Sequence, residues 1–410
     1  MIKRTLSLYK TSFTGLSPQT WLLSLIILIN RSGTMVLPFM TLYLTGKGMN
    51  RSLSDAGLVM GLWGFGSIIG AYFGGKLSDK IGFQKVQILT LFMGGIMFIV
   101  LGQIKLYPLI CLTTFILSFV NEAFRPANSS AIAFYSKPEN RTRSYSLNRL
   151  AVNLGWAVGA SLGGIVASYN YELLFWVDGI TNIIAAVIMF FAFKPELNLK
   201  SKPTTEKVEP NKGAYKDKFY LWFIFLVVMF GMCFFQLFTT IPKYYRDEMH
   251  LSERFIGFIM ALNGILIVIM EMVVIYKMEG RRKNLIFISI GTAICALSFL
   301  SLLLPGNAKL ICLLMILLVT IGEITAMPFM STFMVSRTNE KNRGQYAALF
   351  TMAWGIGQTF GPYLCSQIVE AGNFNIMFMV CAAAFLMTSL GFWRLNKAID
   401  SPKGNNTSLN

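Results

Sequence analysis

Long runs of apolar residues, separated by short polar segments, fill the chain from residue 18 to residue 395. A helix needs about 18 mostly apolar residues to cross the hydrocarbon core of a bilayer. Runs of that length predict twelve membrane-spanning helices, at 18–44, 54–75, 86–104, 107–135, 144–168, 172–193, 219–244, 254–276, 285–304, 308–335, 345–370 and 374–395. The first run follows a polar start and is too long for a signal-peptide core, so we expect it to be retained. The pattern therefore predicts an all-α integral membrane protein.

Composition and charge agree with this prediction. Hydrophobic residues make up 54% of the chain, charged residues 13%, and the mean hydropathy is +0.57, which excludes a soluble globular protein. The net charge of +17 does not require a nucleic acid partner, because the basic residues sort by side. The loops after odd-numbered runs carry only Lys47, Arg51, Lys105, Lys243, Arg246, Arg254 and Lys309. By the positive-inside rule we expect both termini in the cytoplasm. We also expect a multi-pass protein of a cell membrane, with the bacterial cytoplasmic membrane favoured, and a monomer.

The chain also carries an internal repeat. Residues 194–218 are rich in lysine and proline and lie close to the midpoint, so they are interpreted as a cytoplasmic linker. We expect six-helix halves at 1–193 and 219–396, and a cytoplasmic tail at 397–410. A shift of 202 positions superimposes five residues of the two halves: Pro126 on Pro328, Asn140 on Asn342, Arg141 on Arg343, Gly155 on Gly357 and Gly159 on Gly361. Duplication explains these matches.

Charged residues lie in the middle of several apolar runs. Arg31, Glu122 and Glu323 are each at such a position, where a charge costs roughly 2.5–3.5 kcal/mol, so we expect parts of a pathway or of a pair, with Glu122 and Glu323 as the likeliest acidic partners of Arg31. Glu122 and Arg125 share a helix face and could pair with each other, or Glu122 could pair with Arg31 across two helices. Glu323 has no obvious partner in its own half. It is our first candidate for a proton carrier, against a structural, hydrogen-bonded glutamate.

The segment between the second and third runs contains a motif. It reads Gly75-Lys76-Leu77-Ser78-Asp79-Lys80-Ile81-Gly82-Phe83-Gln84-Lys85. This resembles the loop signature G-x-L-[AS]-D-[KR]-x-G-[RK]-[RK]-[RK] of the major facilitator transporters, although Phe83 and Gln84 stand where the family has basic residues. The resemblance implies two pseudo-symmetric six-helix halves around a cavity lined by spans 1, 4, 7 and 10.

In that family the motif aspartate faces the N-terminus of span 11 and latches the cytoplasmic side. The resemblance therefore assigns Gly75, Asp79 and Gly82 to a cytoplasmic gate, with Arg141, Arg143 or Arg343 as the cationic partner of Asp79. A carboxylate at a helix N-terminus contributes roughly 0.3–1 kcal/mol. The corresponding segment of the second half, residues 278–283, is degenerate, so we expect a one-sided latch.

Span 5 carries Gly155, Gly159 and Gly163, a pattern that resembles the motif of the antiporter branch, with Ala160 in place of its proline. Span 11 carries Gly357 and Gly361, and span 2 also has glycines at this spacing. Such spacing lets helices approach closely, so simple packing explains it equally well. We expect these glycines to mark the interfaces of span 2 with 11 and of span 5 with 8.

The same resemblance places further residues. Arg31, Glu122, Gln236 and Glu323 fall on the four spans that line the cavity, together with Arg125. Arg149 of span 5 and Glu271 of span 8 each lie about five residues inside the cytoplasmic end of their span. Because a helix rises about 1.5 Å per residue, the two side chains are expected at the same depth in the membrane. Because spans 5 and 8 abut in the family, we expect an ion pair that closes the cytoplasmic gate. The family's signature arginine before the span 4 proline is missing, since Thr114 holds its place.

These features predict a secondary active transporter. The motifs favour proton-coupled antiport, the efflux of small amphipathic molecules, as in the drug/proton antiporter branch. A proton-coupled importer of small solutes such as peptides or sugars is the alternative, and a non-transporting receptor on the same fold is a further one. We expect no enzyme, cofactor or metal, because the chain has no P-loop and no metal-ligand cluster, and its six cysteines show no CxxC spacing. The proton gradient would supply the energy.

Overall fold

The computed structural model describes residue 8 and residues 10–45, 49–193, 213–339 and 341–400, and these residues are almost entirely helical. From residue 18 onward, the α-helices of the N-terminal part are α2 (Pro18–Ser32), α3 (Val36–Thr45), α4 (Leu53–Ile81), α5 (Phe83–Gln103), α6 (Tyr107–Glu122), α7 (Phe124–Tyr135), α8 (Arg141–Tyr169) and α9 (Glu172–Ala192). They are followed by α10 (Lys218–Phe234), α11 (Thr240–Asp247), α12 (Glu253–Met278), α13 (Asn284–Ser301), α14 (Ala308–Ser336), α15 (Arg343–Ala371) and α16 (Phe374–Asp400).

Ten helical stretches of the described chain are long and apolar enough to cross a membrane. The two other runs predicted from the sequence are also helical, but each differs from a simple span. Residues 18–44 form α2 and α3 with a break between them, and α15 is a continuous helix whose apolar sequence includes several polar side chains. The all-α membrane architecture is therefore confirmed, whereas the count of twelve spans stays a prediction.

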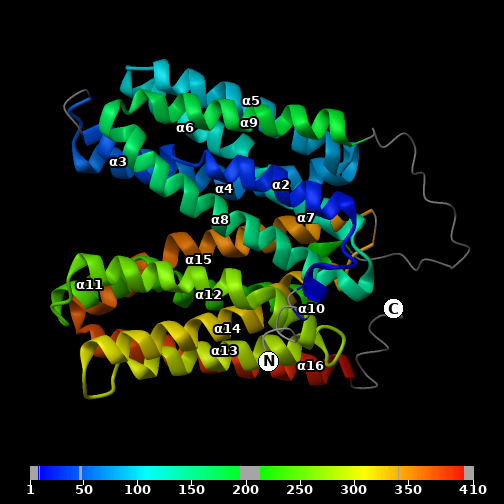
Figure 1. Ribbon diagram of the computed structural model, residues 1–410, viewed down its shortest axis with the longest axis vertical. Coiled ribbons are helices and arrows are strands. Elements are labelled where there is room, and N and C mark those ends of the chain that lie inside the picture. Colours follow the sequence, from blue (N-terminus) through cyan, green and yellow to red (C-terminus); the bar gives the residue numbers. More distant parts are fainter. Residues whose placement is uncertain (1–7, 9, 46–48, 194–212, 340, 401–410) are drawn as a thin grey trace, which may run out of the picture.

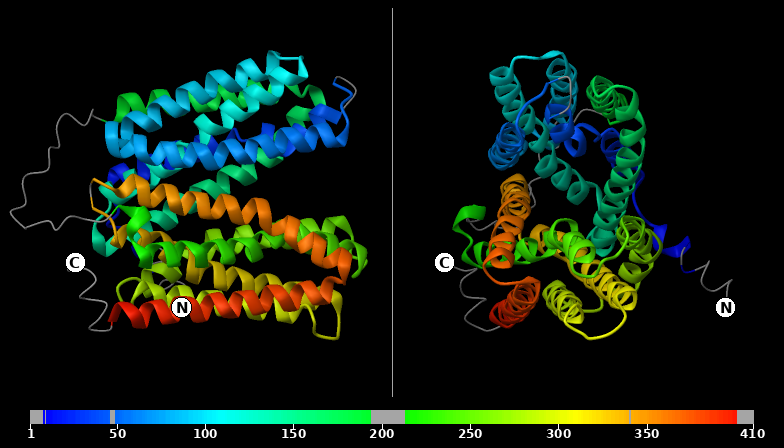
Figure 2. Two further views of the ribbon diagram at one scale, coloured as in Figure 1. Left: turned by 180° about the vertical axis from the view of Figure 1, so that it is seen from behind. Right: turned by 90° about the vertical axis from the view of Figure 1, so that its left-hand side faces the viewer.

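The helices form two bundles, α2–α9 and α10–α16, which lie one above the other in Figure 1 and are seen from two further sides in Figure 2. Residues 194–212 of the expected linker lie outside the described residues, and α16 continues to Asp400, beyond the expected boundary at 396. We call the end of the molecule at which α9 ends and α10 begins the linker side, and the opposite end the far side.

The two bundles touch on the linker side. Gly75 of α4 packs so closely on α15 that a side chain there would collide with the carbonyl oxygen of Gly344. The same face of α4 carries Gly64 and Gly61, since helix neighbours recur every three to four residues. A Cβ atom on Gly64 would lie 3.7 Å from α15, whereas one on Gly61 would meet no atom within 4 Å. The two helices therefore separate toward the far side.

Helix α12 shows the same divergence. Its linker-side part contacts α8 through Glu271. Gly264 and Gly257 follow on the same face at intervals of seven residues toward the far side, and a Cβ atom on either would meet nothing within 4 Å. The bundles also diverge in the left view of Figure 2. The structure is thus closed between the halves on the linker side and open on the far side.

Candidate functional site

Three helices are interrupted near the middle of the bundle. The first span breaks between α2 and α3, the span formed by α6 and α7 is interrupted by a single residue, Ala123, and the short 3₁₀ helix η3 (Phe235–Phe238) separates α10 from α11. The breaks in the first and seventh spans correspond under the 202-residue shift, because Gly33 maps onto residue 235. Discontinuous helices at matching positions of two repeats are a feature of transporter binding sites.

Side chains of α9 hold the break in the first span. Asp178 is 1% exposed and accepts hydrogen bonds from the backbone N–H groups of Met35 (2.8 Å) and Val36 (3.0 Å) at the start of α3. Asn30, at the end of α2, donates to Asn182 at 2.8 Å. The two bonds to Asp178 satisfy backbone N–H groups that an interrupted helix leaves free inside a membrane, and the Asn30–Asn182 bond ties the side chains of α2 and α9 together. Asp178 therefore caps a neighbouring helix.

Arg31 lies directly before this break. Arg31 is 5% exposed, and within the described part of the chain its guanidinium makes no hydrogen bond or ion pair. The charges that act on it most strongly are those of Arg125 and Glu122. The expectation that Arg31 pairs with Glu122 or Glu323 is therefore wrong for this conformation. Neither acid is available, because each already has a cationic partner.

Glu122 pairs with Arg125 on the same helical rod. The distance from Arg125 Nε to Glu122 Oε2 is 2.8 Å, in the i, i+3 arrangement that the sequence allowed. Of the two alternatives for Glu122, the structure contains the local pair.

Gln236 lies in η3 and is fully buried. Its amide nitrogen donates to the Met232 carbonyl oxygen at 2.7 Å, and its amide oxygen accepts from Thr240 Oγ1 at 2.6 Å. Both bonds are within the interrupted seventh span. Gln236 thus bridges the break in the seventh span from within that span, whereas Asp178 of α9 holds the break in the first span from a neighbouring helix.

Arg149 of α8 joins the two halves. Its guanidinium forms a two-pronged ion pair with Glu271 of α12, in which Nε lies 3.1 Å from Oε1 and Nη2 pairs with Oε2. The remaining Nη1 atom lies 2.6 Å from Glu323 Oε1 of α14. The Arg149–Glu271 contact expected from matching depths is therefore present. Its extension to Glu323 was not expected.

Glu323 has partners on both sides of the interface. Besides Arg149, Asn263 of α12 donates to its Oε2 atom at 3.2 Å, and Asn263 also donates to Thr320 at 2.9 Å. The idea of an unpaired carboxylate at Glu323 is therefore wrong. Sequence reasoning looked for a partner within its own half, whereas the cation comes from the other half.

A second inter-half contact lies at the linker-side end of α4. The carboxylate of Asp79 accepts the backbone N–H groups of Gly344 (2.6 Å) and Gln345 (2.9 Å), in the first turn of α15. Anions are stabilised at such helix N-termini. We call this contact the Asp79 latch.

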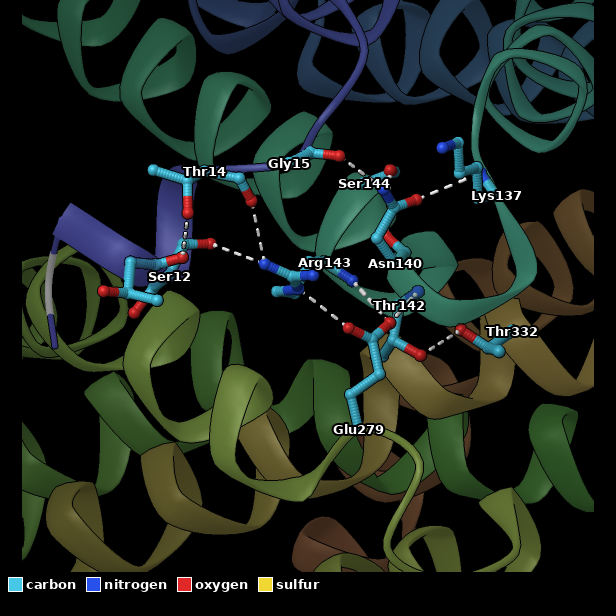
Figure 3. Close-up of polar contacts among 11 residues, drawn as sticks. Ser12, Thr14, Gly15, Lys137, Asn140, Thr142, Arg143, Ser144, Glu279 and Thr332 are labelled. Atoms are coloured by element: carbon cyan, nitrogen blue, oxygen red, sulfur yellow. Dashed lines mark hydrogen bonds and ion pairs between the residues drawn. The ribbon is translucent and has the colours of Figure 1, made fainter.

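An equivalent contact joins the other pair of helices, as Figure 3 shows. Glu279, just after α12, accepts the backbone N–H groups of Thr142 (2.8 Å) and Arg143 (3.3 Å) in the first turn of α8. The Arg143 Nε atom lies 2.8 Å from the second oxygen of the same carboxylate. We call this the Glu279 latch. The prediction of a one-sided latch is therefore wrong, and Arg143, proposed as a partner of Asp79, pairs with Glu279 instead.

Arg143 also holds the N-terminal segment. Its Nη1 atom donates to the carbonyl oxygens of Thr14 (3.0 Å) and Ser12 (3.4 Å). Asn140 donates to the Gly15 carbonyl oxygen at 2.6 Å (Figure 3). The segment before α2 is thereby tied to the Glu279 latch.

Most of the motif glycines pack within their own half. Side chains on Gly155 or Gly159 of α8 would meet Arg31 and its neighbours in the first span, and one on Gly163 would meet Met35 and Phe39 there. Likewise, Gly357 and Gly361 of α15 lie against Gly231 and Met232 of α10. The expectation that these glycines mark the interfaces between the halves is therefore wrong. Glycine spacing identifies a face that is closely approached, but it does not identify the helix that approaches it.

Three residues of this network were missed or misread from sequence. Glu279 lies in the degenerate second-half counterpart of the loop motif, residues 278–283, and this position was the one sequence signal for its role. Asn263 carried no signal beyond being polar in an apolar run. Asp178 carried no signal beyond being a polar residue near one end of the sixth apolar run, although Gly33 inside the first span was a sign that the span is interrupted there. In the part of the chain that the structure describes, no group of three acidic, histidine or cysteine side chains could hold a metal ion.

Comparison with known proteins gives the same picture. The profile of the Major Facilitator Superfamily matches residues 20–362. The uncharacterized MFS-type transporter YttB of Bacillus subtilis (strain 168) is 26% identical over 388 residues, which cover 92% of this chain and 95% of YttB. Multidrug resistance protein 2 of the same strain is 23% identical over 365 residues, covering 86% and 88%.

A similar solved structure is the bacterial homologue of the iron transporter ferroportin in its outward-facing state. It matches with a TM-score of 0.75 and 18% identity, over 93% of this chain and all of that one. At this identity the likeness concerns the fold alone. Together with the family match and the membrane-spanning helices, it leads to a plain conclusion. The chain belongs to the Major Facilitator Superfamily and is a multi-pass bacterial membrane transporter, not an enzyme.

Proposed function

We propose that this protein is a proton-coupled antiporter that exports small amphipathic molecules. The observation that carries the proposal is the triad of Arg149, Glu271 and Glu323, which joins the two halves inside the membrane. The side chains are 18%, 1% and 7% exposed, so the three charges interact with little screening by solvent. One guanidinium faces two carboxylates, which leaves one negative charge in excess when both acids are ionised.

A single proton cancels that excess. If Glu323 takes the proton, it loses its charge-assisted contact with Arg149, and the tie between α8 and α14 weakens. Because breaking a buried ion pair changes stability by about 3–5 kcal/mol, the protonation state can shift the balance between linker-side-closed and linker-side-open conformations. Glu271 would keep its two-pronged pair and hold Arg149 in place for the return step.

The direction of coupling follows from sidedness. We propose that the linker side is cytoplasmic, because the loops on that side carry most of the basic residues. The open far side then faces the exterior and gives external protons access to Glu323. Protonation would favour opening to the cytoplasm, where the proton leaves and the substrate enters. Restoring the ionised triad would close the linker side again and carry the substrate outward.

One relative supports efflux. Multidrug resistance protein 2 of Bacillus subtilis aligns along most of its length, and its name assigns to it a role in drug resistance. The extent of the alignment includes the spans that carry the triad in this chain. Export is therefore favoured over import.

The decisive experiment uses the purified full chain in proteoliposomes with an imposed pH gradient. A panel of fluorescent amphipathic molecules that are anionic, neutral or cationic is offered, and probe and proton fluxes are recorded together. We expect Glu323→Gln to reduce gradient-driven transport at least 10-fold while exchange of probe without a gradient continues. Glu370→Gln, the same change at an exposed site on the far side, is the matched control.

Two results would contradict the proposal. The first is wild-type transport of panel members that does not respond to the pH gradient. The second is gradient-driven transport that survives in Glu323→Gln at the level of the control. Movement of probe and protons in the same direction would identify an importer instead.

A further inference from the structure

The buried charges of this protein differ in one respect. Six charged residues are buried in the described part of the chain: Arg31, Glu122, Asp178, Asp217, Glu271 and Glu323. The five acids all have partners, which are arginine side chains or, for Asp178, the backbone N–H groups of α3. Arg31 is the exception, since its guanidinium has no hydrogen bond or ion pair there.

An unpaired charge at this depth needs an explanation. Keeping an arginine at the centre of a membrane-spanning helix costs roughly 2.5–3.5 kcal/mol even on the mildest scale. Nearby groups do not remove this cost. Arg125 repels the charge of Arg31, and Glu122, which attracts it, is already engaged with Arg125. The three side chains together carry one positive charge in excess, so the set is completed by an anion.

We propose that Arg31 binds the anionic group, a carboxylate or a phosphate, of the transported molecule. This inference rests on the proposed transport function and adds the substrate class to it. A guanidinium presents five N–H donors in a planar fork that fits two oxygens of such a group. None of the Arg31 nitrogen atoms is among the buried side-chain atoms that lack both solvent contact and a partner. A ligand can therefore replace solvent at the guanidinium.

The position of Arg31 supports the same conclusion. It lies at the break of the first span, at a depth that corresponds to η3 in the seventh. The break in the seventh span carries aromatic rings in place of a charge: Phe234 and Phe235 lie 6.3 Å and 6.0 Å from the ring of Trp354. One half thus offers a cation and the other an apolar, aromatic surface at the corresponding position. This combination fits an amphipathic anion with an apolar body.

Binding to the purified protein tests the proposal without any proton gradient. The probes are dansylglycine, which carries a carboxylate, and dansylglycinamide, its uncharged analogue, together with naphthyl and alkyl bodies that bear a carboxylate, a phosphate or an amide. We expect wild type to bind anionic members at least 10-fold more tightly than their amides. Arg31→Met should remove this preference. Arg31→Lys, which keeps the charge but loses the fork, should retain part of it.

Thermal unfolding separates this role from a structural one. If Arg31 awaits an external anion, then Arg31→Met without ligand should melt at or above the wild-type temperature, because an uncompensated charge has been removed. Arg125→Met is the matched comparison and should melt lower, because it leaves Glu122 unpaired. An Arg31→Met protein that melts as low as Arg125→Met, or that still prefers the anionic probes, would overturn the proposal. So would a wild type without any preference across the panel.

A lipid phosphate could supply the same chemistry. The binding measurement is therefore repeated with phosphatidylglycerol as the competitor. Displacement of the probes by this lipid, combined with failure of every anionic probe to be transported, would assign Arg31 to a lipid headgroup and refute a substrate role. The outcomes are also separable from the proton-coupling test. Transport that does not depend on the pH gradient, together with an intact preference for anionic probes, contradicts only the proposed function. Gradient-dependent transport without a preference for anionic probes contradicts only this inference.

Discussion

The Asp79 latch and the Glu279 latch do the same work at equivalent places, but they are built differently. Each places a carboxylate on the first-turn N–H groups of a helix from the other half, and the two pairs of N–H groups correspond under the 202-residue shift. In the Asp79 latch the short side chain requires the helices to approach closely, at Gly75 and Gly344. In the Glu279 latch the longer glutamate side chain reaches the first turn of α8 from a position just after the end of α12.

The residues in the first helical turn also differ between the two latches. Thr142 takes the place of Gly344 in the Glu279 latch. Its side chain is accommodated there without a steric clash, and its hydroxyl oxygen accepts a hydrogen bond from Thr332 Oγ1 at 3.0 Å. Gln345 is replaced by Arg143, which adds an ion pair to the backbone bonds. The comparison teaches that the glycines of the motif serve close approach, whereas the anion at a helix N-terminus is the shared principle. A latch can therefore exist without the motif.

Exchanging the residues at the equivalent helix starts should have the largest effect. A threonine at Gly344 would collide with the backbone of Gly75, which cannot move aside as a side chain would. Overpacking costs about 1–3 kcal/mol, so we expect Gly344→Thr to shift the conformational balance toward linker-side opening by up to about 100-fold. Distances between spin labels at Lys85 and Lys397 would report this opening.

The reverse exchange is the control. Thr142→Gly loses one hydrogen bond, worth about 1 kcal/mol, and should shift the same distance distribution only a few-fold. Equal effects of the two exchanges would show that close approach at the Asp79 latch is not what closes the linker side.

Neutralising the two carboxylates should have intermediate effects. Asp79→Asn and Glu279→Gln each leave N–H donors without a charged acceptor, at about 1–3 kcal/mol. Because Glu279 also loses its ion pair with Arg143, we expect its substitution to open the linker side at least as much. Glu139→Gln, at an exposed acid on the same side, should leave the spin-label distances unchanged. If only Asp79→Asn opens the linker side, the latch is functionally one-sided after all.

Removing the guanidinium should have the smallest effect. Arg143→Ala leaves Glu279 ionised and bonded to its two backbone N–H groups, so we expect a smaller shift in the closing equilibrium than Glu279→Gln gives. The larger consequence should be local, because Arg143 also holds Ser12 and Thr14. Hydrogen exchange at residues 11–15 should become faster, with no change near Asp79. Unchanged exchange in that segment would mean that Arg143 does not hold it.

Sequence reasoning was most successful where one helix decides the outcome. Apolar runs predicted the helices, and the spacing of Glu122 and Arg125 allowed their pair, because both depend on the chain's local period. Depth matching also gave Arg149 and Glu271 across the two halves. Depth matching failed for Glu323, because its cation, Arg149, also pairs with Glu271. Matching residues two at a time does not reveal that one guanidinium can bind two carboxylates.

By itself, the sequence determined the membrane character and the presence of costly charges in apolar runs, because these follow from hydrophobicity, periodicity and residue type, and its loop motif indicated the family by resemblance. Only the tertiary structure decided which helices the glycines approach, which acid each arginine serves, and that Glu279 completes a second latch. The physical reason is that a helix presents several faces, and the neighbour of each face is set by packing of the whole bundle. Among the residues that the structure describes, the same packing leaves the Arg31 guanidinium without a hydrogen-bond or ion-pair partner.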